Sequence, residues 1–369
     1  MDQESCCCVL PSSLRQTIRV ASARGSWLTD HDGRDYLDFV QGNAVNTLGH
    51  AADEIHVSLK NQAQRLLYCA PRICNEPMMA LAQRLTQLAG LARISFCGSD
   101  HEANENAILL ARRWGKARGA HQIISTRLDF PGRSTVGSGF IKTPYNDLAA
   151  VENAINRQTA AVLVEPIDSE SGLSLPSPFF LRGLRRLTQE HGILLIIDET
   201  RSGIGRTGHL FAFQDEGVAP DILTLARGLG GGLPLAATLV RQEFSSVLEE
   251  SQHLGSGHSL TMSATLAVLD TLCAPGFLDE VASTGHFLQK GLERLARYHQ
   301  LGQVRGKGLL QAVCIPDGTA EQLARAALEE GLLVDAPRAD WLRMMPALNV
   351  SLAEVDEMLV RLASALCKR

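Results

Sequence analysis

The sequence has no tract of basic residues, no apolar run long enough to cross a bilayer, and no Cys–His pair at zinc-binding spacing near its three adjacent cysteines. Its net charge is −5, and the scattered lysines and arginines do not form the basic stripe that nucleic-acid binding needs. The strongest apolar run, Gly192 to Ile197, is far shorter than the roughly 20 residues of a membrane helix. We therefore expect a soluble protein with no nucleic-acid, membrane or metal partner.

The N-terminus also lacks the basic and then apolar layout of a secretion signal, since Asp2 and Glu4 occupy its start. A cytoplasmic location is expected, in which the nine cysteines remain reduced. Cys6, Cys7 and Cys8 leave metal binding or acylation open, but neighbouring side chains diverge, which favours an oxidisable tail.

A chain of 369 residues predicts two or three domains. Between residues 90 and 240, short apolar runs alternate with amphipathic ones. The run from Thr159 to Ile167 is continuous and β-branched, which is typical of a strand buried on both faces. Ser177 and Pro178 predict the start of a helix that ends at Gly192. This alternation predicts an α/β fold, a parallel or mixed sheet covered by helices on both faces.

The pattern changes after about residue 262, where two helical runs precede a strand–turn–strand and two further helices. This order predicts a smaller α+β domain. Near the N-terminus, a hairpin pattern has Asp32-Gly33 as its turn. We predict three parts: an N-terminal segment (1–48) packed on the small domain, a large domain (49–262) and a small C-terminal domain (263–369).

Three charged residues follow predicted strands: Glu165, Asp198 and Arg227. Any one of them alone is simply a polar residue that closes a strand. Ligands of open α/β sheets gather at the carboxyl ends of the strands, so three together indicate a site. Arg227 lies in "DILTLARGLGGGLPLAA", a strand that passes through a glycine-rich turn into another strand.

The runs "VLVEPIDSESG", "LLIIDETRSGIGRTGHLFAFQDEG" and "GNAVNTLGH" resemble the class III aminotransferases, and within them the acetylornithine/ornithine group. The resemblance extends from about Gly25 to the C-terminus. It implies pyridoxal phosphate (PLP) as cofactor and the fold-type-I architecture of PLP transferases. That architecture has a mostly parallel sheet between helices in a large domain, a smaller α+β domain, and a homodimer with shared active sites.

The resemblance also assigns roles within the site. Asp198 matches the carboxylate that keeps the cofactor's pyridine nitrogen protonated. Phe130 matches the aromatic residue that stacks on the ring. Arg133 and Arg343 match arginines that bind substrate carboxylates, and Glu170 matches a glutamate near the substrate side chain.

One departure removes the family's central group, because Arg227 stands where the Schiff-base lysine is expected. That lysine must lose its proton to form the imine and to move protons, and arginine stays charged in proteins. Six lysines occur elsewhere and lie in other motifs: Lys60, Lys116, Lys142, Lys290, Lys307 and Lys368.

The phosphate end departs as well. The family binds phosphate at a helix N-terminus with small residues after a serine, whereas this chain has Ser99, Asp100 and His101. We predict Asp100 as the helix N-cap, where it occupies the amides that phosphate would use and repels the anion. A protonated His101 would offset that repulsion.

Three further positions differ from the family. Gly257 aligns with a phosphate-contacting threonine contributed across the dimer, Arg201 with a glutamine near the cofactor's phenolic oxygen, and Pro131 with a histidine. The segment after Thr135 is shortened. A single engineered change would leave the phosphate site intact, so these departures favour natural drift over engineering.

We hypothesise a pseudoenzyme that keeps the fold and dimer, with PLP bound weakly, non-covalently or not at all. Arg227 would pair with Asp198, and the cleft would be lined by cations suited to a carboxylate or phosphate ligand. Three alternatives stay open. They are an active acetylornithine or ω-amino-acid aminotransferase with non-covalent PLP, altered chemistry in the same cleft, and a structural protein without a ligand.

Overall fold

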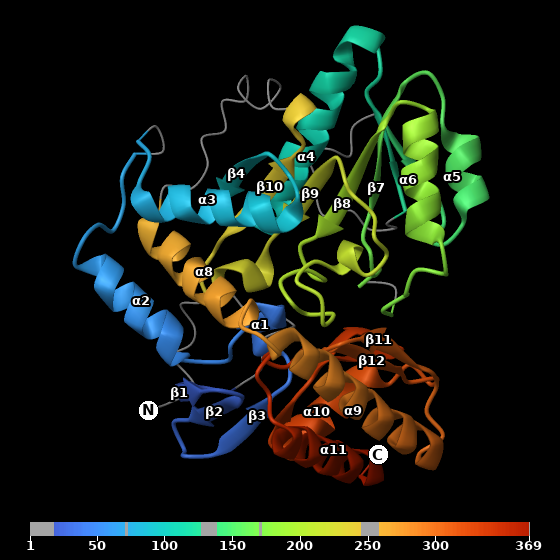
Figure 1. Ribbon diagram of the computed structural model, residues 1–369. Helices are drawn as coiled ribbons and strands as arrows, with labels where there is room; N and C mark the ends of the chain where they lie inside the picture. The colour runs from blue at the N-terminus through green and yellow to red at the C-terminus, as the bar shows by residue number, and fades with distance from the viewer. Residues whose placement is uncertain (1–17, 71–72, 127–138, 170–171, 245–257, 369) are drawn as a thin grey trace, which may run out of the picture.

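The computed structural model describes residues 18–70, 73–126, 139–169, 172–244 and 258–368. Figure 1 shows a sheet with its helices above a smaller assembly of strands and helices. The strands are β1 (Val20–Arg24), β2 (Trp27–Asp30), β3 (Asp35–Asp38), β4 (Arg93–Cys97), β5 (Gln122–Ser125), β6 (Phe140–Lys142), β7 (Thr159–Val164), β8 (Leu194–Glu199), β9 (Ile222–Leu225), β10 (Ala236–Val240), β11 (Val304–Lys307), β12 (Leu310–Cys314), β13 (Leu332–Leu333), β14 (Asp335–Arg338) and β15 (Trp341–Met344). The α-helices are α1 (Gln41–Ala44), α2 (Asp53–Ala63), α3 (Glu76–Ala89), α4 (Asp100–Gly115), α5 (Leu148–Ala154), α6 (Phe180–Glu190), α8 (Ser259–Leu272), α9 (Phe277–Tyr298), α10 (Ala320–Glu329) and α11 (Leu352–Cys367).

The central sheet has seven strands in the order β4-β10-β9-β8-β7-β5-β6. The pairs from β9 to β6 are parallel, and β10 is antiparallel to both of its neighbours. This arrangement confirms the predicted α/β fold with a mostly parallel sheet between helices.

Alternate residues of β7 face opposite sides of the sheet, and all of them are buried. Val162 and Val164 pack in the apolar cluster that contains α6 and α8 residues, whereas Ala161 and Leu163 pack with α4. A strand covered on both faces gains from apolar side chains at every position, which explains the continuous β-branched run.

The start of α6 corrects one expectation. The N-cap is Phe179, at φ 69°, with no side-chain cap, and Ser177 and Pro178 precede the helix. The amide of Ser177 donates to Oδ1 of Asn146 at 2.7 Å, which ties this segment to a neighbouring turn. The predicted cap is therefore wrong, because the helix begins at Phe180 and Phe179 takes the cap position.

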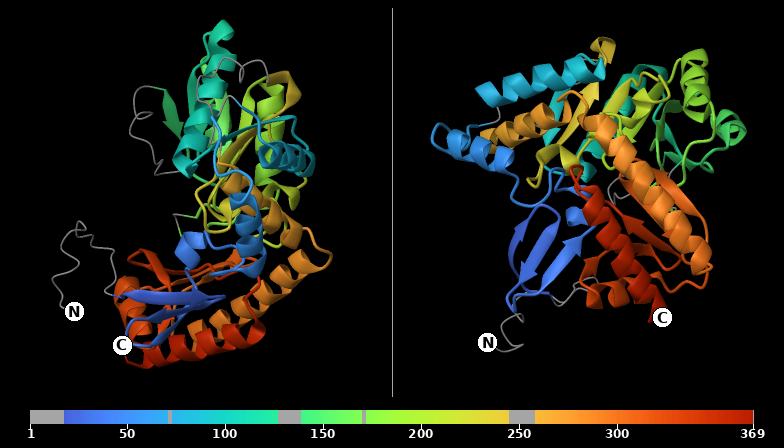
Figure 2. Two further views of the ribbon diagram at one scale, coloured as in Figure 1. Left: turned by 90° about the vertical axis from the view of Figure 1, so that its left-hand side faces the viewer. Right: turned by 60° about the horizontal axis from the view of Figure 1, so that its bottom comes forward.

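The remaining strands form two smaller sheets, β1-β2-β3-β13 and β11-β12-β15-β14. Leu37 of β3 pairs in parallel with Leu332 of β13, so the N-terminal strands lie beside the C-terminal elements (Figure 2). The proposed boundary at residue 262 falls inside α8, which packs against α2 and α3. The division into three parts stays a prediction.

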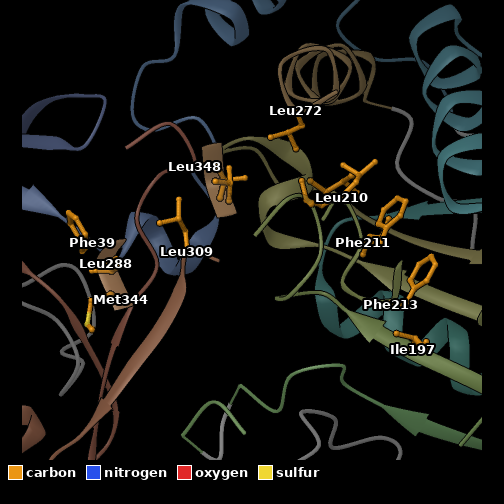
Figure 3. Packing of buried hydrophobic residues seen from close by; sticks show 14 of the residues in the cluster. Phe39, Ile197, Leu210, Phe211, Phe213, Leu272, Leu288, Leu309, Met344 and Leu348 are labelled. Atoms are coloured by element: carbon orange, nitrogen blue, oxygen red, sulfur yellow. The ribbon is translucent and has the colours of Figure 1, made fainter. Parts of the chain in front are cut away.

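A single apolar cluster joins the central sheet to these smaller sheets. Figure 3 follows it from Ile197 of β8 past Leu210 and Leu348 to Met344 of β15 and Phe39. All five side chains are buried. The two halves of the molecule therefore share apolar packing, which fixes the small assembly against the carboxyl edge of the large sheet.

None of the described helices is by itself long and apolar enough to span a membrane. The helices α8 and α9 meet that test only as a pair, across a bend of 75°. Among the described residues, no histidine, cysteine, aspartate and glutamate side chains gather in a group of three that could hold a metal ion.

Candidate functional site

The candidate site lies at the carboxyl edge of the central sheet. Glu165 follows β7, Asp198 is the penultimate residue of β8, and Arg227 comes two residues after β9. These three strands are adjacent and parallel, and Asp198 pairs with Thr224 across β8 and β9. The topology therefore brings the three predicted strand-end residues to one edge.

Asp198 is 2% exposed and is held by several donors. Its Oδ2 accepts from Nδ2 of Asn104 at 2.9 Å. Its Oδ1 accepts from the amide and the hydroxyl of Thr200, at 2.9 and 2.6 Å. Asn104 in turn accepts a hydrogen bond from Thr224 through Oδ1 at 2.8 Å. This network fixes the carboxylate against α4 and sets its orientation.

The neighbouring Glu199 is fully buried and points to a different partner. Its two oxygens accept the amides of Ala212 and Phe213, each at 2.7 Å. Burial raises the pKa of this carboxyl to about 8, while the two amides oppose the shift. Glu199 thus organises the loop that follows β8 and carries a carboxyl that is largely neutral at pH 7.

Arg227 adopts a backbone conformation that is uncommon for residues other than glycine, with φ 46°. It opens a short 3-10 turn, η4 (Arg227–Gly230). Beside it, the four residues of α1 also have positive φ. Nη1 of Arg227 donates to the Asn43 carbonyl at 3.5 Å, and the Thr47 hydroxyl donates to the Gly228 carbonyl at 2.6 Å. Backbone strain of this kind concentrates at functional sites.

Arg227 pairs with Asp100 rather than with Asp198. Its Nη2 lies 3.1 Å from Oδ2 of Asp100, and the predicted Arg227–Asp198 ion pair is absent between these two described residues. That prediction was wrong because Asn104 and Thr200 already satisfy the Asp198 carboxylate.

The cap of α4 also differs from the prediction. Ser99 is the N-cap, and its hydroxyl accepts the amide of Glu102 at 3.2 Å. Asp100 is instead the first helical residue, with Oδ1 accepting the amide of His101 at 2.9 Å. Asp100 is displaced from the cap because Ser99 has the extended backbone that a cap requires. Its carboxylate nevertheless accepts an amide at the N-terminus of α4, in agreement with the prediction that Asp100 occupies amides that a phosphate group would use. The imidazole of His101 is half-exposed, with Nε2 3.9 Å from Glu105.

Arg343 is buried and paired with Asp335. Nε of Arg343 donates to Oδ2 of Asp335 at 3.0 Å, and Nη1 donates to the Ser169 carbonyl at 3.0 Å. The Ser169 hydroxyl accepts from Nη1 of Arg201 at 3.3 Å. Ser169 therefore connects Arg201 on the β8 side with Arg343 on β15.

The cleft lined by cations stays a prediction, although two of its arginines are paired with carboxylates of the protein. Within the described chain, Arg227 and Arg343 each face a carboxylate of the protein itself. The remaining predicted site residues lie outside the described residues: Phe130, Arg133, Glu170 and Gly257.

Sequence reasoning missed three residues that build the site: Asn104, Ser169 and Asp335. Asn104 lies one turn of helix after Asp100, a spacing that places both on one face of α4. Asp335 and Arg343 flank a short hairpin turn, so an antiparallel pairing of the two strands would have predicted their contact. No local pattern pointed to Ser169.

The family model "Aminotransferase class-III" matches residues 11–140 and 139–366. The chain belongs to the class III aminotransferases. It is 43% identical to acetylornithine aminotransferase 2 of Bordetella bronchiseptica over 94% of each chain. It is 40% identical to the acetylornithine aminotransferase of Ralstonia nicotianae over 95% of each.

A solved structure supports the same fold for this class III aminotransferase. The N-acetylornithine aminotransferase of Stenotrophomonas maltophilia superposes with a TM-score of 0.89 at 31% identity, covering 96% of this chain and 97% of the other. The fold-type-I architecture expected from the motifs is therefore confirmed.

The family implies PLP, and the described residues fit that cofactor at one end only. Asp198 is a buried carboxylate at the carboxyl edge of the sheet, the kind of group that a pyridine nitrogen needs as its partner. At the other end, the turn after β9 offers a guanidinium in place of an amine, and Asp100 engages the helix N-terminus and Arg227 together. The described residues thus do not fit PLP held through a lysine imine.

Proposed function

We propose that this class III aminotransferase is a pseudoenzyme of the acetylornithine type. It binds an ω-amino acid such as N-acetylornithine, or a related carboxylate or phosphate ligand, without transaminating it through lysine-bound PLP. PLP binds weakly, non-covalently or not at all. The observation that carries this proposal is the Arg227–Asp100 ion pair at the end of β9. A guanidinium held by a carboxylate offers no amine to a carbonyl carbon.

The second candidate is an active enzyme of the family. Sequence similarity alone favours it over a pseudoenzyme, because the relatives at 43% and 40% identity are named as acetylornithine aminotransferases. Such an enzyme would use PLP without a covalent bond to the chain, or different chemistry in the same cleft. Asp198 supports it, because this carboxylate is buried and held in place at the carboxyl edge of the sheet, as a PLP site needs.

One experiment separates the two candidates. The purified protein is incubated with PLP and then with N-acetylornithine and 2-oxoglutarate, while retained PLP, binding of N-acetylornithine and formation of glutamate are measured. The pseudoenzyme binds N-acetylornithine, forms no glutamate above the rate of free PLP, and shows no visible absorbance from a lysine imine. Sustained formation of glutamate would establish the active enzyme instead.

A homodimer and a cytoplasmic location also remain predictions. Several large apolar side chains on α2 and in the segment that follows it are exposed: Val57, Leu67, Tyr68 and Ile73. Exposed apolar side chains that are close together are typical of subunit interfaces. Light scattering coupled to gel filtration tests the dimer, and twice the 39.9 kDa chain mass is the expected result.

A further inference from the structure

Arg343 meets a carboxylate that belongs to its own chain. The strands β14 and β15 are antiparallel, and their register places Asp335 directly opposite Arg343. Nε and Nη2 of Arg343 both donate to Oδ2 of Asp335. Directly opposed residues share one face of a sheet, so the strand pairing itself maintains this contact. The ion pair is therefore built into the hairpin.

The two partners differ in their access to solvent. The side chain of Arg343 is 7% exposed, whereas that of Asp335 is 25% exposed. Nη1 of Arg343 also donates to the Ser169 carbonyl, so each nitrogen of the guanidinium has an acceptor. Arg343 is thus a buried cation whose three nitrogens each donate one hydrogen bond, and Asp335 is the partner that a solute can reach and displace.

A ligand carboxylate at Arg343 would need the hydrogen bonds that Asp335 now receives. A guanidinium binds a carboxylate through paired N–H donors, and Nε and Nη2 form such a pair. Two carboxylates cannot both take these donors without bringing like charges into contact. A ligand that uses the Nε/Nη2 pair must therefore displace Asp335 and expose its charge to water before it can bind there.

We propose that Asp335 is an intramolecular competitor for the ligand carboxylate at Arg343 and so determines how tightly the cleft binds carboxylates. This inference rests on the proposed function, because it takes Arg343 as the residue that receives the carboxylate of an ω-amino acid. Asp335 acts through Arg343 and is a specificity-determining residue. Replacing Asp335 with an uncharged residue leaves the buried guanidinium of Arg343 without a counter-charge.

The test is isothermal titration of the full-length protein with two probes, N-acetyl-L-ornithine and N-acetylputrescine. The second probe has the same chain and amine but no carboxylate. The variant Asp335→Asn keeps the side-chain shape and removes the charge. Its matched control is Asp340→Asn, because Asp340 pairs with Arg338 on the same hairpin at 3.1 Å and that pair is exposed. Both variants change the net charge equally.

We expect Asp335→Asn to bind N-acetylornithine about tenfold more tightly than the wild type, as hydrogen bonds to charged groups warrant. Binding of N-acetylputrescine should not change, and Asp340→Asn should match the wild type with both probes. Adding Arg343→Gln to Asp335→Asn should abolish the gain. Circular dichroism checks that each variant folds, and Asp335→Ser replaces Asp335→Asn if the latter does not.

The outcomes separate this inference from the proposed function. Wild-type binding with no gain in Asp335→Asn overturns the inference and leaves the proposed function standing. A gain that Asp340→Asn or N-acetylputrescine shares reflects net charge or a looser hairpin, and it also overturns the inference. If neither the wild type nor Asp335→Asn binds N-acetylornithine, the proposed function is wrong and the inference falls with it.

Discussion

Nη2 of Arg227 lies 3.1 Å from Oδ2 of Asp100, and this contact joins the end of β9 to the first residue of α4. In the family resemblance, these two positions serve opposite ends of one cofactor: the imine and the phosphate. Here they bind each other. The charges of these two side chains therefore compensate each other within the cleft.

Replacing Arg227 with lysine should not restore PLP chemistry. In Arg227→Lys, the Asp100 carboxylate still engages the His101 amide and repels a phosphate group. The triple variant Arg227→Lys/Asp100→Gly/Gly257→Thr should retain PLP after dialysis and show visible absorbance. The double variant Asp100→Gly/Gly257→Thr is the control without a lysine. Retention of PLP and turnover by Arg227→Lys alone would show that the phosphate site is still competent.

The Arg227–Asp100 ion pair should contribute only a small coupling free energy to the stability of the fold. The side chains are 21% and 34% exposed, so solvent screens part of the attraction. A double-mutant cycle with Asp100→Asn and Arg227→Gln should give a coupling free energy of about 0.5–1 kcal/mol in urea unfolding. The coupling should decrease in high salt. A coupling near zero at low salt would mean that the pair does not stabilise the fold.

Asn104→Ala should destabilise the protein more than a surface substitution does. Asn104 is 1% exposed and donates to Asp198, so its loss leaves a buried carboxylate short of one donor. The expected loss in the free energy of unfolding is about 1–3 kcal/mol. Asn104→Asp, which sets a second carboxylate beside Asp198, should cost more at pH 7 than at low pH. Equal stability of Asn104→Ala and the wild type would contradict the network described for Asp198.

Glu199 should make folding stability fall as the pH rises. Burial raises the pKa of this carboxyl to about 8, from an ordinary value of 4.5. Between these values the folded chain holds a proton that the unfolded chain has lost, so a rise in pH penalises the folded state. Glu199→Gln cannot ionise. The stability advantage of the wild type over Glu199→Gln should therefore shrink from pH 5 to pH 8 in chemical unfolding, and a constant difference would refute the assignment.

Elements that depend mainly on local sequence were predicted correctly. The continuous apolar run of β7 and the glycine-rich turn after β9 both lie where the pattern placed them. The α4 helix was also located, although Ser99 and not Asp100 caps it.

Prediction from sequence failed where the deciding partner is distant. The amide of Ser177, which precedes α6 and does not cap it, donates to Asn146, 31 residues away in the chain. The Arg227–Asp198 pair was expected because both follow adjacent strands, yet Asn104, 94 residues from Asp198, satisfies that carboxylate first. Arg343 was recognised by resemblance, but its partner Asp335 depends on a strand register that only the folded hairpin displays.

The left-handed turn of α1 bears on the order in which the chain folds. Only one of its four residues is glycine, so Gln41, Asn43 and Ala44 hold positive φ against their own preference. The contact of Asn43 with Arg227 joins residues 184 positions apart, and the bond from Thr47, just after this turn, to Gly228 spans 181. These long-range contacts cannot form in a nascent chain that lacks the turn after β9. In pulse-labelled refolding, the amides of α1 should be among the last to gain protection, which makes this short segment a reporter of completed folding.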